Sequence, residues 1–283
     1  MAVRIVTDST ADLPPELARE LGITVVPLTV IFDGVAYRDG LDIQADDFYA
    51  RLQSSKSLPT TAAPAPADFA AAYDSLLNEK GVEGIVSIHL SGKLSATYNN
   101  ACQAAEGLGD KSEFVAVFDS KSGSLGTGLQ VILAARAAAG GATSSEVLAL
   151  LKRYVDKVKL VFVVDTLEYL QRGGRIGRAR AFLGNLLQIK PILSVRDGEI
   201  YPEERVRTRR QALDRLFQLC AQTPFVQEIG VVHATTPEEA DELQRRFRAA
   251  FPAANIYFSR LGPALGVHLG PGVIGAGVLQ REA

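Results

Sequence analysis

Serine and threonine residues gather at three places where the sequence predicts the end of a β-strand. Asp8–Thr10 follow the apolar run 3–7, Ser95 and its neighbours follow the run 84–90, and Asp119–Ser124 follow the run 113–118. Helix capping by Ser and Thr explains part of this pattern, but not the gathering at three strand ends. Because ligands of open parallel sheets bind beyond the carboxyl ends of the strands, these segments predict a binding site lined by hydroxyl groups.

Ser95 is predicted to open a helix over residues 94–106, directly after a strand. Free backbone N–H groups and the dipole at the start of a helix favour an anion, and a serine hydroxyl can add one donor. The preceding Gly92-Lys93-Leu94 lacks the leading glycine and the Ser or Thr of a phosphate-binding loop. A site with hydroxyl donors and little positive charge suits one carboxylate better than a polyphosphate.

Two well-known enzyme motifs are incomplete in this chain. Gly270–Gly275 matches the dinucleotide-binding glycine pattern, but it precedes a predicted strand, and no helix follows it. The Gly-x-Ser-x-Gly sequence that surrounds the nucleophile of many serine hydrolases does not occur. Neither nucleotide binding nor this kind of hydrolysis is therefore indicated by a local motif.

The histidines and one arginine differ in their sequence surroundings. His89 lies within a predicted strand and His233 ends another, so both are most simply packed residues. His268 lies in the Gly/Pro-rich segment 262–272, predicted to be a loop from which side chains can reach a site. Arg175, in the glycine-flanked loop 173–177, is either a structural hydrogen-bonding centre or an anion ligand, and the sequence does not separate the two.

The composition is that of a globular protein without an excess of positive charge. The chain has 283 residues, of which 47% are hydrophobic and 22% charged, and the formal net charge is −2. With 30 basic against 32 acidic residues, we expect no nucleic-acid partner. Two cysteines and three histidines do not suggest a zinc site or a disulfide framework, so no metal is expected. Without a signal-peptide pattern or an apolar run of about twenty residues, we expect a cytoplasmic protein with no stable membrane insertion.

The order of predicted elements indicates an α/β protein with two domains. In the first half, strands alternate with helices, which predicts crossover connections and a Rossmann-like parallel sheet. In the second half, a hairpin with its turn at Asp197-Gly198 stands among long helices, which predicts an α+β domain with a mixed or antiparallel sheet. We place the boundary near residues 157–159, giving domains 1–158 and 159–283. Residues 54–66, which are small, polar and Pro-bearing, are predicted to be a loop.

Several segments taken together resemble the DegV family of bacterial fatty-acid-binding proteins, over essentially the whole chain. Each segment alone identifies the family only modestly, whereas the segments together, in this order, identify it strongly. The segments are Ile5-Val6-Thr7-Asp8-Ser9-Thr10-Ala11-Asp12-Leu13, Val26-Pro27-Leu28, Thr61–Pro66, Leu90–Asn99, Leu167–Gly177, Lys190–Leu193 and Gly266–Gly272.

The resemblance implies a two-domain DegV-like fold with a lipid pocket and four ligand-binding residues. Thr61 and Ser95 match the hydroxyl residues that meet the fatty-acid carboxylate, and His268 and Arg175 match the residues that complete the polar network. Some positions depart from the family pattern, so secondary head-group contacts and chain preference are expected to differ. The departures are Ala62, Ala63 and Ala65 in the loop after Thr61, and Gly92 before Ser95.

The function implied by the resemblance is that of a carrier without catalytic activity of its own. The protein would bind a long-chain fatty acid such as palmitate, stearate or oleate and present it to a separate ATP-dependent fatty acid kinase. The acyl phosphate formed would serve phospholipid synthesis, and this chain would need no cofactor. The alternative is a small-molecule phosphotransferase or hydrolase that uses Asp8, Asp119 and His268, and turnover by the purified chain would favour it.

Overall fold

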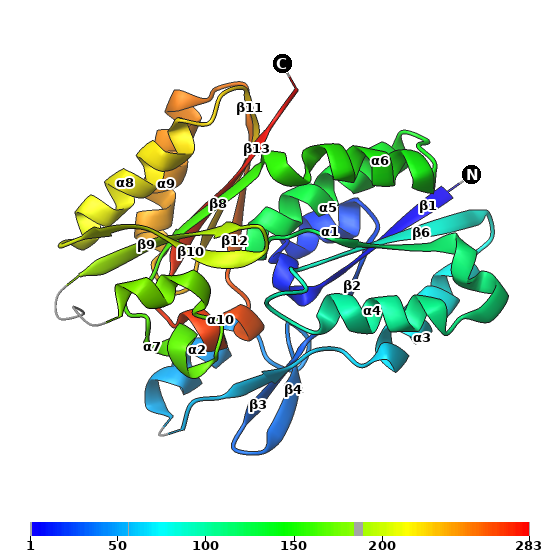
Figure 1. The fold of residues 1–283 in the computed structure, drawn as a ribbon, viewed down its shortest axis with the longest axis horizontal. Coiled ribbons are helices and arrows are strands. Elements are labelled where there is room, and N and C mark those ends of the chain that lie inside the picture. The colour runs from blue at the N-terminus through cyan, green and yellow to red at the C-terminus, as the bar shows by residue number, and fades with distance from the viewer. Residues whose placement is uncertain (1, 56, 184–188, 283) are drawn as a thin grey trace.

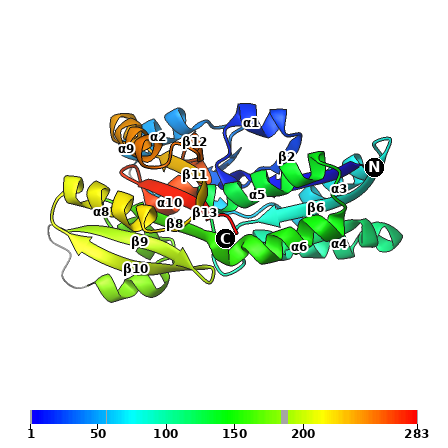
Figure 2. The ribbon, with the colours of Figure 1, turned by 90° about the horizontal axis from the view of Figure 1, so that it is seen from above.

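The computed structural model describes residues 2–55, 57–183 and 189–282, whose strands form three sheets (Figure 1). A four-stranded parallel sheet and a six-stranded mixed sheet occupy opposite ends of the molecule, and a three-stranded sheet lies at the bottom of this view. From above, the two larger sheets follow one another along the long axis (Figure 2). The predicted fold class is confirmed, including the parallel N-terminal sheet and the mixed C-terminal sheet.

The parallel sheet has the strand order β2-β1-β6-β7 and is covered by helices on both faces. Its strands are β1 (Ala2–Asp8), β2 (Ile23–Val26), β6 (Val82–His89) and β7 (Val115–Asp119). Its helices are α1 (Pro15–Glu20), α3 (Pro66–Leu77), α4 (Thr97–Glu106), α5 (Ser124–Ala139) and α6 (Ser144–Tyr154), with 3₁₀ turns η1 (Ser9–Ala11), η2 (Gly109–Phe114) and η3 (Val155–Lys157).

The alternation of side chains along the central strands explains why both faces are covered. Successive residues of a strand point to opposite faces. Ile5 and Val86 pack against α5 and α6, whereas Val6 and Ile85 pack against α3 and α4. The carboxyl ends of these strands therefore lie between two helical layers, near the six-stranded sheet.

The six-stranded sheet has the order β10-β9-β8-β13-β11-β12, antiparallel except for the β11–β12 pair. Its strands are β8 (Val158–Val163), β9 (Lys190–Arg196), β10 (Glu199–Val206), β11 (Val226–His233), β12 (Asn255–Arg260) and β13 (Ile274–Gln280). The helices of this part are α7 (Glu168–Arg172), α8 (Arg209–Ala221), α9 (Pro237–Ala250) and α10 (Pro263–Leu269), with the 3₁₀ turn η4 (Gly177–Phe182).

The helices α8 and α9 cover one face of this sheet, through side chains such as Leu216 and Phe247. The opposite face turns toward α5, α7 and α10. All strands of this sheet follow residue 157, and those of the other two sheets precede it. This distribution agrees with two domains divided near residue 158, although the division itself stays a prediction.

The three-stranded sheet, in the order β4-β3-β5, contains a strand that the sequence did not predict. The turn between β3 and β4 is Asp33-Gly34, a residue pair typical of tight hairpins, and its φ angles are 47° and 83°. Residues 54–66, predicted to be a loop, include β5, which pairs antiparallel with β3. This strand of three residues is too short for a recognisable alternation of side chains. The elements of this part are β3 (Thr29–Phe32), β4 (Val35–Arg38), β5 (Thr60–Ala62) and α2 (Ala45–Ser54).

The prediction of a loop over residues 262–272 is wrong, because this segment contains α10. Pro263 stands at the first helical position, where a missing N–H does no harm. Gly266 lies in the middle of the helix, where an added Cβ would come within 2.5 Å of the Phe48 ring. Glycine is therefore needed here for close packing, and its presence made the helix unrecognisable in the sequence.

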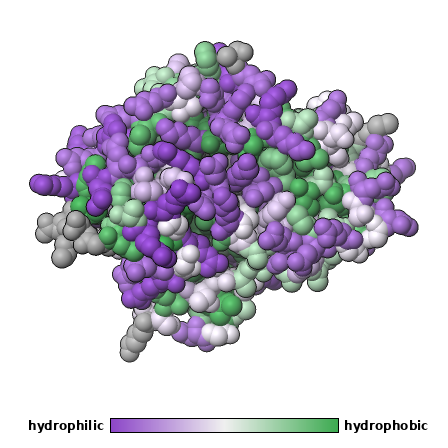
Figure 3. Space-filling view, in the orientation of Figure 1, coloured by the Kyte–Doolittle hydropathy of each residue, from purple (hydrophilic) through white to green (hydrophobic). Residues whose placement is uncertain are grey.

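The largest apolar cluster lies where α2, α10 and the three-stranded sheet meet the six-stranded sheet. It includes Val30, Phe48, Leu167 and Leu193, all nearly inaccessible to solvent. On the face shown in Figure 3, hydrophilic residues surround smaller hydrophobic areas. Within the described ranges, no helix has the length and apolar character that crossing a bilayer requires.

Candidate functional site

An apolar cavity lies within the largest apolar cluster, between the six-stranded sheet, α10 and the segment after β6. The space between protein atoms amounts to about 780 Å³, part of which is open to solvent. Most of its wall is aliphatic or aromatic, and the polar side chains in the wall are few. Apolar residues that line it include Leu28, Leu90, Leu160, Phe162, Val232 and Leu265.

All four residues predicted to bind the ligand line this cavity: Thr61, Ser95, His268 and Arg175. Thr61 is the middle residue of β5 and pairs with Val30 of β3. Ser95 lies in the turn before α4, His268 in the last turn of α10, and Arg175 in the loop between α7 and η4. Residues from four distant parts of the chain thus meet at one cavity.

Thr61 and His268 are in direct contact, with Oγ1 of Thr61 at 2.8 Å from Nε2 of His268. Burial, together with a smaller contribution from the positive charge of Arg175, lowers the pKa of His268 to about 4. The imidazole is therefore neutral near pH 7 and carries one ring proton.

The surroundings of the ring indicate which nitrogen of His268 carries the proton. Nδ1 is buried and has no hydrogen-bond partner among the described residues, and a Cβ on Gly173 would lie only 2.3 Å from it. Because a buried N–H without an acceptor is rarer than a buried lone pair without a donor, we assign the proton to Nε2. Nε2–H then donates to Thr61 Oγ1, and the Thr61 hydroxyl proton is free to donate to another acceptor.

Arg175 joins two parts of the polar wall through its backbone contacts. Its Nε donates to the carbonyl of Leu94 at 3.2 Å, and its Nη1 donates to the carbonyl of Gly173 at 2.6 Å. The structure therefore supports the hydrogen-bonding role considered for this arginine. The side chain is exposed, so this polar part of the cavity lies close to the protein surface.

Ser95 does not open a helix as predicted, because α4 begins at Thr97 with Ala96 as its N-cap. Ser95 Oγ accepts from the Thr97 backbone N–H at 3.3 Å and lies 2.9 Å from the Thr97 hydroxyl. The turn of residues 91–95 contains two hydrogen bonds to the Ser91 carbonyl, as a helical turn does. This explains why the sequence predicted a helix that begins before α4. Ser95 still faces the cavity, one residue before the N-cap.

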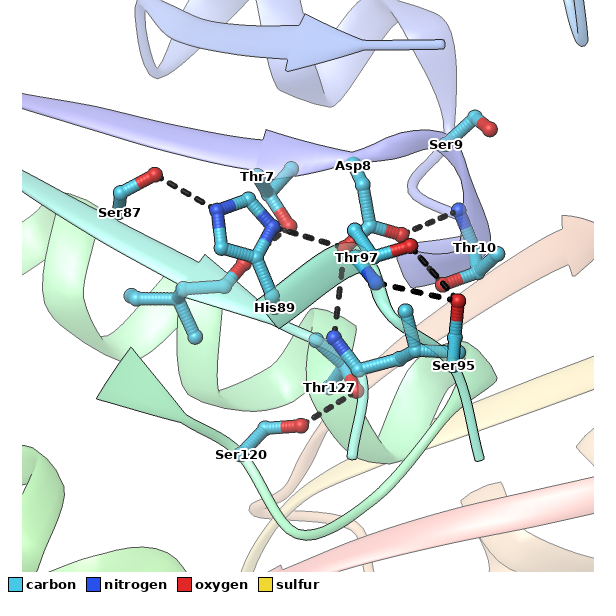
Figure 4. Close-up of polar contacts among 12 residues, drawn as sticks. Thr7, Asp8, Ser9, Thr10, Ser87, His89, Ser95, Thr97, Ser120 and Thr127 are labelled. Atoms are coloured by element: carbon cyan, nitrogen blue, oxygen red, sulfur yellow. Dashed lines mark hydrogen bonds and ion pairs between the residues drawn. The ribbon is translucent and has the colours of Figure 1, made fainter. Parts of the chain in front are cut away.

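Most other hydroxyls at the strand ends take part in internal hydrogen bonds (Figure 4). Thr10 donates to Asp8 through its hydroxyl and its backbone N–H. Asp8 Oδ2 lies 2.9 Å from His89 Nδ1, and His89 Nε2 lies 2.7 Å from Ser87 Oγ. The hydroxyl of Tyr73 donates to Ser87 Oγ at 2.8 Å. Asp8, Ser87, His89 and Tyr73 are completely buried, so this network holds β1 and β6 together.

Thr10 and Ser124 also line the cavity, although the sequence did not single them out as ligand-binding residues. Their signal was present, because both belong to the hydroxyl-rich strand ends described above. Thr10 follows β1 and Ser124 begins α5, so each stands where a parallel strand has just ended. The general rule for such sheets could therefore have identified them.

The residues of the alternative enzymatic function are not brought together. His268 lines the cavity, whereas Asp8 is buried against His89. Asp119 accepts from the backbone N–H groups of Gly92 and Lys121 at 3.3 and 2.8 Å. In the part of the chain that the structure describes, no three His, Cys, Asp or Glu side chains form a group that could hold a metal ion.

The glycines of the apparent dinucleotide motif have a packing role. A Cβ on Gly272 would lie 1.7 Å from a carboxylate oxygen of Asp165, so a larger residue there would require this side chain to move. Gly270 has a φ of 79° and ends α10, and a Cβ on it would lie 2.5 Å from the Tyr169 ring. These contacts explain the motif without any nucleotide.

Comparison with known proteins places the chain among relatives of similar length. The curated protein DegV of Bacillus subtilis is 36% identical over 279 residues, covering 97% of this chain and 98% of its own. A DegV domain-containing protein of Listeria innocua is 36% identical over 276 residues, covering 96% of both chains.

Solved structures agree with the fold over nearly the full length. A DegV family protein from Thermus thermophilus, described by its fatty acid binding, has a TM-score of 0.90 and 33% identity, covering 99% of this chain and 100% of its own. DegV of Bacillus subtilis, described as a fatty acid binding protein, has a TM-score of 0.89 and 33% identity with the same coverage. A stearic acid-binding protein from Eubacterium ventriosum has a TM-score of 0.90 and 27% identity, covering 98% of both chains. Because the model of the family described as "Uncharacterised protein, DegV family" also matches residues 2–281, this chain belongs to the DegV family.

Proposed function

We propose that this protein binds one long-chain fatty acid in the apolar cavity, with the carboxylate among Thr61, Ser95, His268 and Arg175. The observation that carries this proposal is the combination of a mainly apolar wall with a few polar residues, four of which lie close together. The contact between Thr61 and His268 and the bond from Arg175 to Leu94, next to Ser95, place these four residues in one neighbourhood. A ligand with one anionic end and an alkyl chain matches this distribution.

The energetics of such a ligand agree with the character of the wall. Burial of an alkyl chain contributes about 0.8 kcal/mol per CH₂, so about sixteen carbons supply on the order of 10 kcal/mol of gross transfer free energy. A carboxylate is costly to remove from water unless it accepts hydrogen bonds. The free hydroxyl proton of Thr61, the hydroxyl of Ser95 and the charge of Arg175 provide for this need.

We further propose that the bound fatty acid is presented to a separate ATP-dependent fatty acid kinase in the cytoplasm. The exposure of Arg175 supports this role, because it brings the proposed carboxylate position near the protein surface. An alkyl chain held inside and a carboxylate held near the surface suit a carrier whose ligand is modified by another protein. The resemblance of the sequence to carriers of this kind supports the same assignment.

The first test is mass spectrometry of lipid extracted from the purified protein, together with native mass spectrometry of the intact protein. We expect one fatty acid per chain, either co-purified or bound after incubation with palmitate, stearate or oleate. A protein that shows only its bare mass under all these conditions would contradict the proposal. The kinase role is tested by adding ATP and a fatty acid kinase, where acyl phosphate should form only with both proteins present.

A further inference from the structure

Two buried carboxylates hold the beginning of α10. Asp12 Oδ1 accepts from the Gly262 backbone N–H at 2.8 Å, and Asp39 Oδ2 accepts from the Ala264 N–H at 3.4 Å. The first N–H groups of a helix have no partner within the helix, so side-chain oxygens that accept from them stabilise the helix. A Cβ on Gly262 would lie 3.1 Å from Asp12 Oδ1 and 3.4 Å from Asp39 Oδ1, so both carboxylates contact this turn closely.

Both carboxylates are themselves held by serine hydroxyls from the N-terminal half of the chain. Ser124 Oγ donates to Asp12 Oδ2 at 2.5 Å, and Ser9 Oγ donates to Asp39 Oδ2 at 2.8 Å. Asp12 and Ser124 have positive φ angles of 49° and 46°, a region that aspartate tolerates but that serine rarely adopts. Such strain persists where the surrounding structure enforces it, often at functional sites.

The helix that these carboxylates hold is part of the cavity wall. Ala264, Leu265, His268 and Leu269 of α10 line the cavity, and so does Ser124. Asp12 and Asp39 do not line it but border a second pocket at the other side of the Gly262 turn. Asp12 and Asp39 therefore lie on the far side of α10 from the cavity. Because α10 is short, a change in its first turn would also move His268 at its end.

Burial and nearby negative charge disfavour the ionised forms of Asp12 and Asp39. Burial, together with a smaller contribution from the charge of Asp8, raises the pKa of Asp12 to about 8 and that of Asp39 to about 6. Among the described residues, neither carboxylate forms a salt bridge. Acids kept in such surroundings point to their acceptor oxygens, which serve the N–H groups of Gly262 and Ala264 in a way that an apolar residue would not.

From these contacts we propose that Asp12 and Asp39 are positioning residues for ligand binding, which act by fixing α10 and thereby His268. This inference rests on the proposed function, because the ligand concerned is the fatty acid bound beside Thr61. Loss of either acceptor oxygen would free the first turn of α10 and displace the ring that orients the Thr61 hydroxyl.

The test compares alanine and asparagine variants at both positions. Asp12→Ala and Asp39→Ala should weaken binding of a fluorescent fatty acid by about tenfold. Asp12→Asn and Asp39→Asn keep an acceptor oxygen in the same shape and should stay within about threefold of the wild type. Asp42→Ala is the matched control, because Asp42 lies in the same segment as Asp39 but is exposed and bound to Arg38.

A second readout separates positioning from general stability. The chain has three histidines, so the ring resonances of His268 can be assigned in NMR spectra by comparison with His268→Gln. The alanine variants should shift these resonances, whereas the asparagine variants and Asp42→Ala should leave them near the wild-type positions. Folded alanine variants with wild-type affinity and unmoved His268 resonances would overturn the proposal.

Two further outcomes remain informative. If the alanine variants do not fold, Ser9→Ala keeps Asp39 but removes the hydroxyl that donates to it and accepts from the Leu28 N–H, and it should still shift the His268 resonances. An unchanged spectrum would overturn the proposal. If the wild type binds no fatty acid, the proposed function fails, but the His268 resonances still decide whether Asp12 and Asp39 position the helix.

Discussion

The contact between Thr61 and His268 leads to a prediction about how the two residues act together. Thr61→Val keeps the shape of the side chain but removes the hydroxyl, which leaves Nε2–H of His268 without its acceptor. A hydrogen bond to a charged group contributes about 1.5–3 kcal/mol, so fatty-acid affinity should fall about ten- to a hundredfold. His268→Phe keeps a flat ring but no longer orients the Thr61 hydroxyl, so it should also weaken binding.

The effects of the two variants should not add. Once the Thr61 hydroxyl is absent, the orienting bond from His268 at 2.8 Å has nothing left to orient. The double variant Thr61→Val/His268→Phe should therefore lose less binding free energy than the sum of the single losses, by about 1 kcal/mol. Residues in direct contact commonly show coupling of this size.

The assay is titration with a fluorescent fatty acid at pH 7, with thermal melts of each variant measured in parallel. Thr60→Val is the matched control, since Thr60 precedes Thr61 on the same strand but is exposed and lines no part of the cavity. Equal affinities for Thr61→Val and Thr60→Val would refute a role for the hydroxyl. Additive losses in the double variant would refute the orientation of Thr61 by His268.

Three further predictions concern stability. Asp8→Ala leaves a buried nitrogen of His89 without its hydrogen-bond partner and should lower the free energy of unfolding by about 1–3 kcal/mol, and an unchanged urea midpoint would contradict this. Folding raises the pKa of Asp12 from 3.8 to about 8, so the folded protein favours the protonated acid and ionisation opposes folding. The free energy of unfolding of the wild type therefore falls as pH rises between these two values. Asp12→Asn should thus gain stability over the wild type between pH 5 and pH 8, by at most about 1.4 kcal/mol per pH unit, and a constant difference across this range would speak against it. Gly266→Ala should destabilise by about 1–3 kcal/mol through contact with Phe48, although alanine favours helices, and a raised melting temperature would count against the packing explanation.

Much of the fold could be predicted from local patterns. The runs 3–7 and 84–90 follow the composition of buried strands, and the Asp-Gly turns at positions 33 and 197 adopt the positive φ angles that these residues tolerate. The segments β5 and α10 were not predicted, because one is very short and the other is rich in glycine and proline. Their structure depends on partners far away in the chain, β3 for the strand and α2 for the helix.

The site was predictable only in part. Thr61 and His268 are separated by 207 positions, and no local pattern joins them, so their pairing was implied by family resemblance alone. The clustering of hydroxyls at strand ends was a real signal, but it pointed mainly to internal hydrogen bonds around Asp8. Asp12 and Asp39 could not be recognised, because a buried carboxylate looks the same in the sequence as an exposed one.

The buried network of Asp8, His89 and Ser87 has a consequence for assigning function by geometry. Its order and distances, 2.9 and 2.7 Å, reproduce those of the catalytic triad of serine hydrolases. A template search based on distances alone would therefore assign hydrolytic activity to this chain. Ser87 Oγ, however, already accepts a hydrogen bond from the Tyr73 hydroxyl and is buried, so no carbonyl carbon could approach it. Access to the nucleophile, rather than the spacing of the three residues, separates a hydrolase from a protein that uses the same set to hold two strands together.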